Sequence, residues 1–370
     1  MRYDVCIIGG GAAGLAAAAS LDDALSVCII EKNRIPGRKI LATGGGRCNM
    51  TNDACEDKQL TMDFFESLGL KMFMDGEGRY YPYSQRASDV VGILERGISD
   101  KADFYFETAA EAVIPSGNHF TVECSGGATL EAGRVILAAG GKAGPCYGTT
   151  GDGYSMAAAL GHKVGKLYPI LCGVECSEKN RRGEKFDFAS VKGIRAKAAV
   201  KLLRDGMPVT DACETGELQF TGYGLSGICV FNLTPYIRTE AGENFRDAMS
   251  RYEIAVDLAP DFSESEVSSR ESSFGILTAE LAELTEGMNI KNLLFAVSGV
   301  RGWKEAQCTG GGVSTDDVSM STMESKLVPG FYLAGEILDI QGPCGGYNLQ
   351  NAWETGIRAA KAINEDLILL

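Results

Sequence analysis

Three glycines near the N-terminus have the spacing of a turn that binds a diphosphate. They occupy positions 9, 11 and 14, and the acid Glu31 follows twenty residues after Gly11. In this pattern the first glycine permits a tight turn, and the second lets the backbone approach a pyrophosphate closely. The third lets the following helix pack against its strand, and the acid accepts hydrogen bonds from ribose hydroxyls. The chemistry predicted from this spacing is the binding of a dinucleotide.

The segments around these glycines are predicted to form the strand–helix–strand unit that such a turn requires. Residues 3–8 are an apolar run typical of a buried strand, and residues 15–21 are rich in alanine, which favours a helix. A second apolar run over residues 26–30 ends directly before Glu31. The N-terminus of the helix offers free N–H groups and a partial positive charge to the diphosphate. The alternative is a glycine turn in an unrelated α/β fold.

Two further loops and a C-terminal strand favour FAD over a nicotinamide dinucleotide. Residues 36–39 and 43–49 are loops, whereas a nicotinamide-binding domain would continue with alternating strands and helices. Such loops suit a longer ligand that extends past the edge of the sheet. Residues 330–336 are an apolar strand with the ending Ala-Gly-Glu, and a helix is predicted over 349–365. This pattern is typical of the second half of a two-part flavin site.

The overall composition is that of a globular protein, and it argues against several other classes. The chain has 370 residues, of which 45% are hydrophobic and 23% charged, which is enough for roughly two to three domains. Because the net charge of −14 opposes binding to phosphate backbones, no nucleic-acid partner is expected. No apolar stretch approaches the roughly 18 residues of a membrane span, so no membrane partner is expected either.

Cysteine and histidine usage indicates a reducing compartment and no metal site. The chain has 12 cysteines, none of them in a Cys-x-x-Cys pair, and its N-terminus lacks the pattern of a signal peptide. We therefore expect free thiols and a cytoplasmic location. The two histidines cannot form a His-rich metal site.

The pattern of apolar and polar residues changes along the sequence, which predicts a discontinuous domain with inserted modules. Residues 104–130 are predicted to hold four short antiparallel strands, and residues 134–139 another buried strand. From about residue 166 short alternating segments such as 198–203 and 228–233 indicate a β-rich module. The predicted divisions are a cofactor domain of residues 1–165 with 305–370, a β-rich substrate module of residues 166–262, and a small helical module of residues 263–304.

Several other motifs have two interpretations each. A second Gly-x-Gly-x-x-Gly at positions 222, 224 and 227 marks either a nicotinamide-binding domain or, as we expect, a loop of the substrate module. Cys48 and Cys344 lie in flavin-proximal loops and are interpreted as structural rather than catalytic thiols. Reduction of a double bond also needs a proton donor. The tyrosine candidates for it, among which the sequence selects none, are Tyr80, Tyr81, Tyr147 and Tyr347.

Five blocks of the sequence resemble the BaiN-like bacterial flavoproteins, a group also labelled aminoacetone-oxidase-like. The match covers nearly the whole chain, and its Gly-Gly-Gly-Arg-Cys-Asn segment over residues 44–49 is highly specific. The blocks are residues 9–14 with 31, residues 37–39 with 44–52, residues 148–154, residues 220–227, and residues 311–313, 322–326 and 345–350.

This resemblance implies an α/β protein of three parts and an activity. The parts are a Rossmann-like FAD-binding domain split into N- and C-terminal halves, an inserted β-barrel-like module, and a small helical module. Family-type flavin contacts fall here on Ala12, Ala13, Glu31, Arg38, Lys39, Gly44, Ala110 and Asn348, with Ala110 meeting the adenine through its backbone. Together with the motifs, the predicted cofactor-binding residues are Gly9, Gly11, Ala12, Ala13, Gly14, Glu31, Lys32, Arg38, Lys39, Gly44, Gly46, Arg47, Cys48, Asn49, Ala110, Ala139, Gly140, Gly335, Glu336, Asp339, Asn348 and Leu349.

Particular roles follow for the charged and C-terminal residues of this set. Arg38 and Lys39 are expected to face the diphosphate, the alternative being a solvated basic turn. Asn348 precedes a helix whose N-terminus, aimed at the N1–C2=O edge of the flavin, would raise its reduction potential. Glu336 and Asp339 either face the ribityl chain or flank a helix on the surface.

The function expected from sequence is FAD-dependent oxidoreduction of a small organic molecule. Members of the resembled group are similar to enzymes that reduce carbon–carbon double bonds of steroid-like bile-acid intermediates. Our specific prediction is reduction of an activated double bond, with NAD(P)H recharging the flavin. The alternatives are an oxidase that passes electrons to oxygen and a flavin redox sensor without turnover. The sequence predicts no catalytic residue and no oligomeric state.

Overall fold

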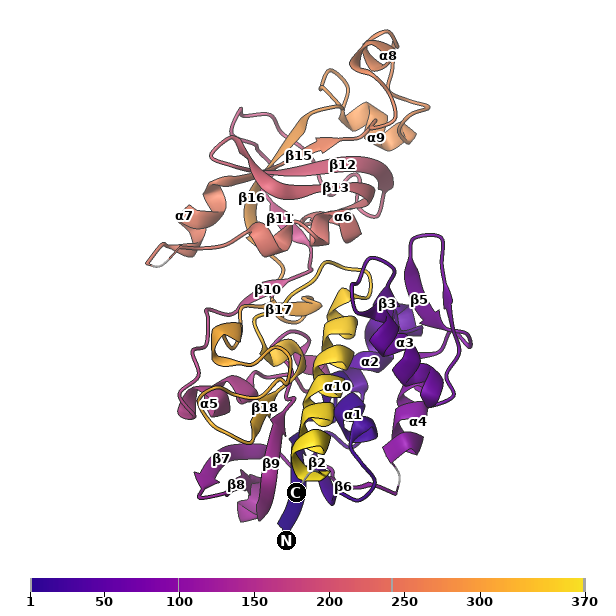
Figure 1. Ribbon diagram of the computed structural model, residues 1–370. Coiled ribbons are helices and arrows are strands. Elements are labelled where there is room, and N and C mark those ends of the chain that lie inside the picture. The colour runs from indigo at the N-terminus through magenta and orange to yellow at the C-terminus, as the bar shows by residue number, and fades with distance from the viewer. Residues whose placement is uncertain (1, 99, 241, 369–370) are drawn as a thin grey trace. The chain divides into compact units, whose positions relative to one another are not determined.

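The computed structural model describes residues 2–98, 100–240 and 242–368. The chain divides into two compact units, which Figure 1 shows in ribbon form. The split unit combines residues 1–167 with 308–370, and the barrel unit is the continuous segment 168–307. Within the described ranges, none of the helices has the length and apolar character needed to cross a membrane.

A seven-stranded sheet with the order β6-β2-β1-β9-β8-β7, to which β18 is added beside β9, forms the centre of the split unit. Strands β1, β2, β6 and β18 run parallel to their neighbours, and β7 and β8 are antiparallel. Segments of β1 and β2 are buried on both faces, as expected for parallel strands covered on both sides. The strands are β1 (Arg2–Ile8), β2 (Val27–Ile30), β6 (Ala102–Tyr105), β7 (Ala110–Ser116), β8 (His119–Cys124), β9 (Thr129–Leu137) and β18 (Phe331–Leu333).

The pairing of this sheet corrects two strand predictions. The segment predicted as an antiparallel strand near residue 104 is β6, which runs parallel to β2. The separate strands predicted around 129 and 134 are one strand, β9. The first half of β9 pairs with β8 and most of its length pairs with β1. One strand therefore links an antiparallel meander to the parallel sheet, a role that local hydrophobicity does not reveal.

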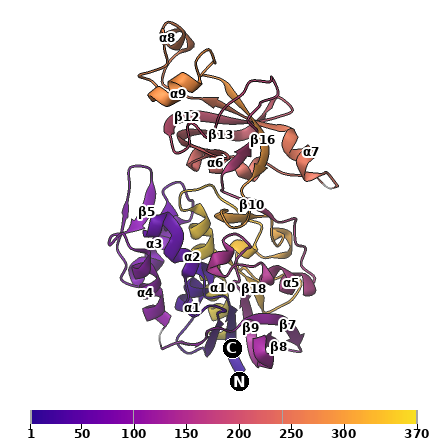
Figure 2. The same cartoon turned by 180° about the vertical axis from the view of Figure 1, so that it is seen from behind.

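The N- and C-terminal parts of the split unit meet at two packed helices. Helix α1 (Ala12–Ser20) lies beside α10 (Tyr347–Ile368), as Figures 1 and 2 show from opposite sides. At Gly356 of α10 a Cβ atom would lie 2.3 Å from the backbone oxygen of Ala13, so only glycine allows this close approach. The other elements of the unit are α2 (Arg38–Ala42), η1 (Thr43–Gly46), β3 (Thr51–Asn52), α3 (Lys58–Ser67), β4 (Met72–Met74), β5 (Arg79–Pro82), α4 (Ala87–Ile98), η2 (Ser125–Gly127), η3 (Pro145–Tyr147), α5 (Asp152–Ala159), β17 (Cys308–Gly310), η5 (Thr315–Asp317) and η6 (Gly335–Ile337).

The barrel unit is a closed barrel of six strands in the order β11-β14-β13-β12-β15-β16. Its interior is apolar and includes an aromatic cluster in which Phe186 stacks on Phe220 and meets Phe295 edge-on. The elements are β10 (Tyr168–Ile170), β11 (Val174–Cys176), β12 (Arg195–Arg204), β13 (Met207–Thr221), β14 (Gly224–Ser226), α6 (Ile228–Phe231), η4 (Thr234–Tyr236), α7 (Phe245–Ser250), β15 (Tyr252–Asp257), α8 (Glu264–Ser268), α9 (Ala279–Leu284) and β16 (Leu293–Val300). The predicted α/β class and the barrel are confirmed.

Two segments of the barrel unit differ from the sequence prediction. Residues 228–231, predicted as part of a strand, form helix α6, because Gly227 with φ +107° ends the preceding strand. Residues 293–300, assigned to a helical module over 263–304, form barrel strand β16 instead. Every second side chain of β16 is buried, which is the period of a strand. Helices α8 and α9 are the only helices in residues 263–304, all of which the structure describes.

Candidate functional site

The glycine turn has the geometry that its spacing predicts. At Gly9, with φ +108°, a Cβ atom would lie 2.4 Å from the oxygen of Ala138, and at Gly14 it would lie 1.9 Å from the oxygen of Gly9. At Gly11, by contrast, no described atom lies within 4 Å of that position. Gly11 caps α1 without a side-chain hydrogen bond from the described residues. The N-cap of α1 at Gly11 therefore faces open space, whereas Ala13 in the first turn is buried.

Glu31 follows β2 and organises the turn. It is 8% exposed, and its Oε2 accepts a hydrogen bond of 2.8 Å from the backbone N–H of Gly10. Its Oε1 accepts hydrogen bonds from the backbone N–H of Asn33 at 2.8 Å and from the Asn33 side chain at 2.6 Å. The Glu31 carbonyl accepts from the N–H of Thr108, which leads into β7 and Ala110. The carboxylate thus already holds the loop in place, and it retains acceptor capacity for a ligand hydroxyl.

Three cationic residues were predicted near this turn, Lys32, Arg38 and Lys39, and each has a partner within the protein. Lys32 pairs with Asp152 at 2.5 Å. Arg38 donates to the side chain of Asn33 at 2.6 Å and to the carbonyl of Cys146 at 2.8 Å. The predicted role of Arg38 and Lys39 beside a diphosphate therefore has to accommodate contacts that these cations make within the protein.

Lys39 and Glu336 form an ion pair between the two halves of the split unit. The Nζ of Lys39 lies 2.6 Å from Oε2 of Glu336, and the side chains are 28% and 21% exposed. Oε1 of Glu336 accepts a 2.8 Å hydrogen bond from the backbone N–H of Thr309. Burial lowers the pKa of Lys39, but the charge of Glu336 outweighs this effect and the pKa is raised above its usual 10.5. Glu336, predicted to face a ribityl chain, thus serves here as the counter-ion of Lys39.

Residues 43–49 form a tight loop in which four of the five residues from 44 to 48 have left-handed backbone conformations. Gly44, Gly45 and Gly46 have φ of +58°, +66° and +85°, and Cys48 has φ +62°. Cys48 is fully buried, and burial raises its pKa to about 12, which supports the structural interpretation of this thiol. Arg47 stacks over the ring of Tyr81 at 4.6 Å from its centroid.

The side chain of Asn49 in this loop carries an unsatisfied acceptor. Its Oδ1 is buried and has no hydrogen-bond partner among the described residues. At Gly346 of the C-terminal half, a Cβ atom would lie 2.8 Å from this oxygen and 2.6 Å from the carbonyl of Thr51. An unpaired buried acceptor costs about 1–3 kcal/mol, and an isoalloxazine ring carries a matching donor in its imide N–H. This acceptor and the open N-terminus of α1 fit a flavin dinucleotide.

The N-terminus of α10 is fixed by Asn348. Its side chain exchanges two hydrogen bonds with the backbone of Gly342, of 2.9 and 3.0 Å, and donates another to the carbonyl of Pro343. Leu349 follows it in the first turn. The prediction that a helix begins next to Asn348 is correct, and the helix is longer than expected.

The remaining predicted residues lie at the ends of the sheet strands. Ala139 and Gly140 lie two and three residues after the end of β9, and Gly335 lies two residues after the end of β18. A Cβ atom at Gly335 would lie 2.9 Å from that of Ala13, so the two halves of the chain touch at the first turn of α1. Asp339 accepts a hydrogen bond from the side chain of Gln341.

Sequence reasoning missed two polar residues of this region. Asn33 connects Glu31 to Arg38, and the hydroxyl of Thr309 accepts from the backbone N–H groups of Lys142 and Ala143. Asn33 follows the predicted acid by two residues but belongs to no motif. No motif contains Thr309. The structure shows why its neighbour Gly141 is a glycine, because a Cβ atom there would lie 2.3 Å from the Thr309 hydroxyl.

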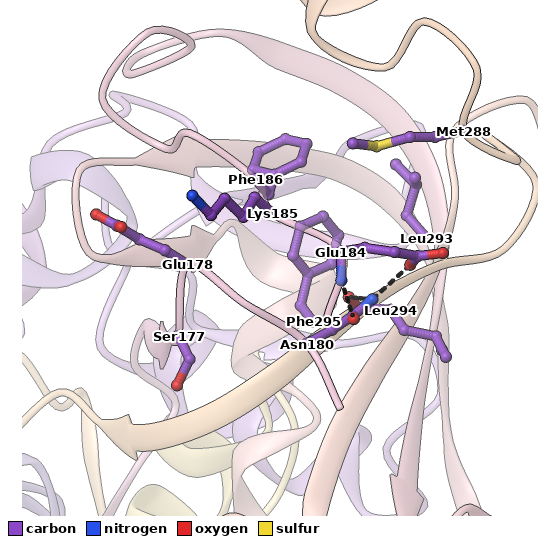
Figure 3. A pocket seen from close by; sticks show the side chains of 10 residues that line it. All are labelled: Ser177, Glu178, Asn180, Glu184, Lys185, Phe186, Met288, Leu293, Leu294 and Phe295. Carbon is purple, nitrogen blue, oxygen red and sulfur yellow. Dashed lines mark hydrogen bonds between the residues drawn. The ribbon is translucent and has the colours of Figure 1, made fainter. Parts of the chain in front are cut away.

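A separate hollow lies on the barrel unit, and none of the predicted cofactor residues lines it. Figure 3 shows aromatic and aliphatic side chains of Phe186, Met288 and Leu293 beside the polar side chains of Asn180 and Glu184. Asn180 donates to Glu184 at 2.6 Å and to the carbonyl of Leu294 at 3.2 Å. These polar groups satisfy one another, so the hollow is not a second candidate for the cofactor.

Sequence comparisons identify relatives over nearly the full chain. The family described as HI0933-like protein Rossmann domain matches residues 3–62 and 56–362. A 3-dehydro-bile acid delta(4,6)-reductase of Clostridium scindens is 34% identical over 97% of this chain and 98% of its own. A ribosomal RNA dihydrouridine synthase of Escherichia coli is 27% identical over 99% of this chain and 98% of its own.

A structural comparison supports the same fold. The 3-ketosteroid delta1-dehydrogenase of Sterolibacterium denitrificans, solved in complex with 1,4-androstadiene-3,17-dione, matches with a TM-score of 0.54. The match covers 99% of this chain and all of the dehydrogenase. At 14% sequence identity it concerns the fold alone.

Proposed function

Because this chain belongs to the HI0933-like Rossmann family and is a flavin-dependent oxidoreductase, we propose that it reduces carbon–carbon double bonds conjugated to a carbonyl group. The observation that carries this proposal is the 34% identity, over almost the full length of both chains, to a reductase of a 3-dehydro-bile acid. In that substrate class the 3-oxo group withdraws electrons from the double bond at position 4, which makes the distal carbon electrophilic.

The second group of relatives is consistent with the same reaction. A dihydrouridine synthase is named for the saturation of a ring double bond in uridine, and that bond is also conjugated to a carbonyl group. The two relatives therefore differ in substrate but share the electronic character of the bond. We propose that an activated double bond of this kind is the substrate feature here.

We propose a small organic molecule and not RNA as the bearer of this bond. The whole chain carries 35 Lys and Arg against 49 Asp and Glu. The barrel unit, residues 168–307, carries 16 Lys and Arg against 21 Asp and Glu. Acidic surfaces repel a phosphate backbone, whereas proteins that bind RNA concentrate positive charge.

In the proposed site the two halves of the split unit hold FAD. The N-terminus of α1, with Gly11, would bind the diphosphate. Glu31 would bind a ribose, and the N-terminus of α10, with Asn49, would bind the isoalloxazine ring. When bound, FAD supplies the hydride for the double bond. We propose that NADH or NADPH then reduces the flavin again. The protein holds and orients the groups and supplies the proton.

The function is tested with the purified protein and FAD under anaerobic conditions. We expect NADH or NADPH to be consumed when 3-oxo-4-cholenoic acid or cyclohex-2-enone is added, with a product that has gained two hydrogens by mass spectrometry. Reoxidation only by oxygen, with peroxide formed, would identify an oxidase instead. Reoxidation only by ribosomal RNA would contradict the choice of a small substrate. Flavin reduction with none of these acceptors used would indicate a redox sensor.

Substituting Asn348 by aspartate is expected to lower the reduction potential of the bound flavin. The new carboxylate would oppose the negative charge that reduction places on the N1–C2=O edge. We expect a decrease of about 30 mV, which is about 1.4 kcal/mol for two electrons. An anaerobic dye titration measures it, with Asn364→Asp on the same helix as the control for added charge. A potential that is unchanged or raised would remove Asn348 from this role.

A further inference from the structure

Three segments of the split unit meet around Gly10 of the glycine turn. The backbone N–H of Gly10 donates to Oε2 of Glu31 at 2.8 Å, and the carbonyl of Gly10 accepts a 2.8 Å hydrogen bond from the N–H of Gly37. Gly37 is the N-cap of α2, whose first residue is Arg38. These contacts bring an acid and a cation to the turn, next to the open position at Gly11.

The amide of Asn33 lies between this acid and this cation. Its Nδ2 donates to Oε1 of Glu31 at 2.6 Å, and its Oδ1 accepts from Nη1 of Arg38, also at 2.6 Å. A carboxylate only accepts hydrogen bonds and a guanidinium only donates them, so a single orientation of the amide satisfies both. Asn33 therefore bridges the two groups without carrying a charge of its own.

The side chain of Asn33 is also fixed by the loop that contains η3. A Cβ atom at Gly148 would lie 2.5 Å from Nδ2 and 2.7 Å from Oδ1 of Asn33, so the amide packs on bare backbone. Nδ2 donates as well to the carbonyl of Tyr147 at 3.4 Å. Arg38 donates to the carbonyl of Cys146 at 2.8 Å. The same short loop therefore holds both partners of the Asn33–Arg38 hydrogen bond.

Of the three cations predicted beside the turn, Arg38 alone has only neutral partners among the described residues. Lys32 is paired with Asp152, and Lys39 is paired with Glu336. The partners of Arg38 are an amide oxygen and a backbone carbonyl. Arg38 therefore retains its positive charge for an anion.

Glu31 likewise has only neutral partners within the part of the chain that the structure describes. The N–H groups from which its carboxylate accepts belong to Gly10 and Asn33. A carboxylate and a guanidinium that approach one turn would ordinarily pair directly, in the bidentate geometry that arginine favours. The amide of Asn33, which is bonded to both, stands between them instead.

We propose that Asn33 is a positioning residue that keeps Glu31 and Arg38 apart so that each binds its own part of the cofactor, an inference that rests on the FAD site proposed above. Glu31 then offers its remaining acceptor capacity to the ribose hydroxyls of the adenosine. Arg38 offers its charge and its remaining N–H groups to the diphosphate. Without Asn33 the guanidinium and the carboxylate would neutralise one another. Asn33 thereby favours a flavin that carries adenosine diphosphate over one that does not.

The test compares Asn33→Ala with the wild-type chain. We expect the affinity for FAD, measured by flavin fluorescence, to fall at least about tenfold, which is about 1.4 kcal/mol. The affinity for ADP, measured by calorimetry, should fall by a similar factor, because ADP carries the ribose and the diphosphate. The reduction potential of bound FAD should be unchanged, because the substitution does not touch the proposed isoalloxazine site. The urea midpoint of the apoprotein should also be unchanged, because a direct Glu31–Arg38 ion pair replaces the lost hydrogen bonds.

Two further single variants serve as control and confirmation. Asn364→Ala is the matched control, because that side chain also joins two backbone groups, the N–H of Asp22 and the carbonyl of Ser20, beyond the opposite end of α1. Its affinity for FAD should equal that of the wild type. Asn33→Asp has the shape of the native side chain and neutralises Arg38 directly, so it should lose FAD affinity at least as strongly as Asn33→Ala.

A double variant separates this role from a local loss of packing. In an Arg38→Met background no cation is present to neutralise Glu31, so Asn33→Ala should cost less FAD affinity than it costs alone. Equal costs in the two backgrounds overturn the assignment. An Asn33→Ala variant whose affinity for FAD or for ADP stays within about threefold of the wild type also overturns it.

The outcome for the wild type distinguishes a failure of this inference from a failure of the proposed function. If the wild type takes up no FAD, the proposed cofactor site fails and this inference fails with it. If it binds FAD and reduces no enone, the proposed reaction alone is refuted, and the affinities of the Asn33 variants still decide the inference.

Discussion

Replacing Gly11 by alanine is expected to weaken FAD binding about a hundredfold, which is about 2.7 kcal/mol, without unfolding the protein. The position has φ −87° and ψ −166°, which alanine adopts freely, and no described atom stands within 4 Å of the added methyl group. Loss of glycine from the N-cap costs at most about 1 kcal/mol. The methyl group would occupy the space through which we propose that the diphosphate reaches α1. Flavin fluorescence titration measures the affinity, and urea unfolding measures the stability.

Gly14→Ala is the contrasting variant of the same motif. Its methyl group would lie 1.9 Å from the Gly9 carbonyl, so the turn must open and the protein should lose well over about 4 kcal/mol or fail to fold. Gly92→Ala, in helix α4 with no described atom within 4 Å, is the neutral control. It should gain up to about 1 kcal/mol in stability and bind FAD normally. Unchanged FAD affinity in Gly11→Ala would contradict the proposed diphosphate site.

Replacing Lys39 by methionine is expected to cost about 2–3 kcal/mol of unfolding free energy. Removing one partner of a buried ion pair costs about 3–5 kcal/mol, because a charge is left unpaired. The pair with Glu336 is partly exposed, so the loss should be smaller. Lys71→Met, which breaks an exposed pair with Glu66, is the control and should change stability little.

The same pair predicts a pH dependence with a definite sign. Because folding raises the pKa of Lys39 above 10.5, the folded state holds its proton more tightly than the unfolded state. The stabilisation that the Lys39–Glu336 pair gives the folded state is complete below about pH 10.5. It is lost as the pH rises through the raised pKa of Lys39. The stability difference between wild type and Lys39→Met should therefore shrink in that range. A difference that is constant with pH would contradict the pairing.

The parts of the site that could be predicted from sequence are those in which a local backbone shape demands a residue type. Gly9 and Gly14 are such positions, because any side chain there would meet a backbone oxygen. Glu31 was found in the same way, since the acid that ends the second strand has a fixed separation from the turn. The helix that follows Asn348 was also predicted, because its hydrophobic period is long and regular.

The contacts that sequence reasoning missed join segments far apart in the chain. The Lys39–Glu336 pair spans 297 positions, and neither residue carries a sign of its partner. The contacts of Tyr223 are a second case, because Gly173 and Arg301, which hold its ring, lie just beyond the ends of other strands. Strand β16 was assigned to a helical module because charged helical segments precede it, although its own side chains alternate.

The division of the sheet between two distant stretches of chain has a consequence for biosynthesis. The barrel unit is continuous and is synthesised before β18 and α10. It can therefore fold cotranslationally. Until β18 and α10 are added, one edge of β9 and one side of α1 remain uncovered in the nascent N-terminal part. These apolar surfaces need protection during that interval. The proposed flavin site, which both halves of the split unit build, is complete only once α10 has joined α1.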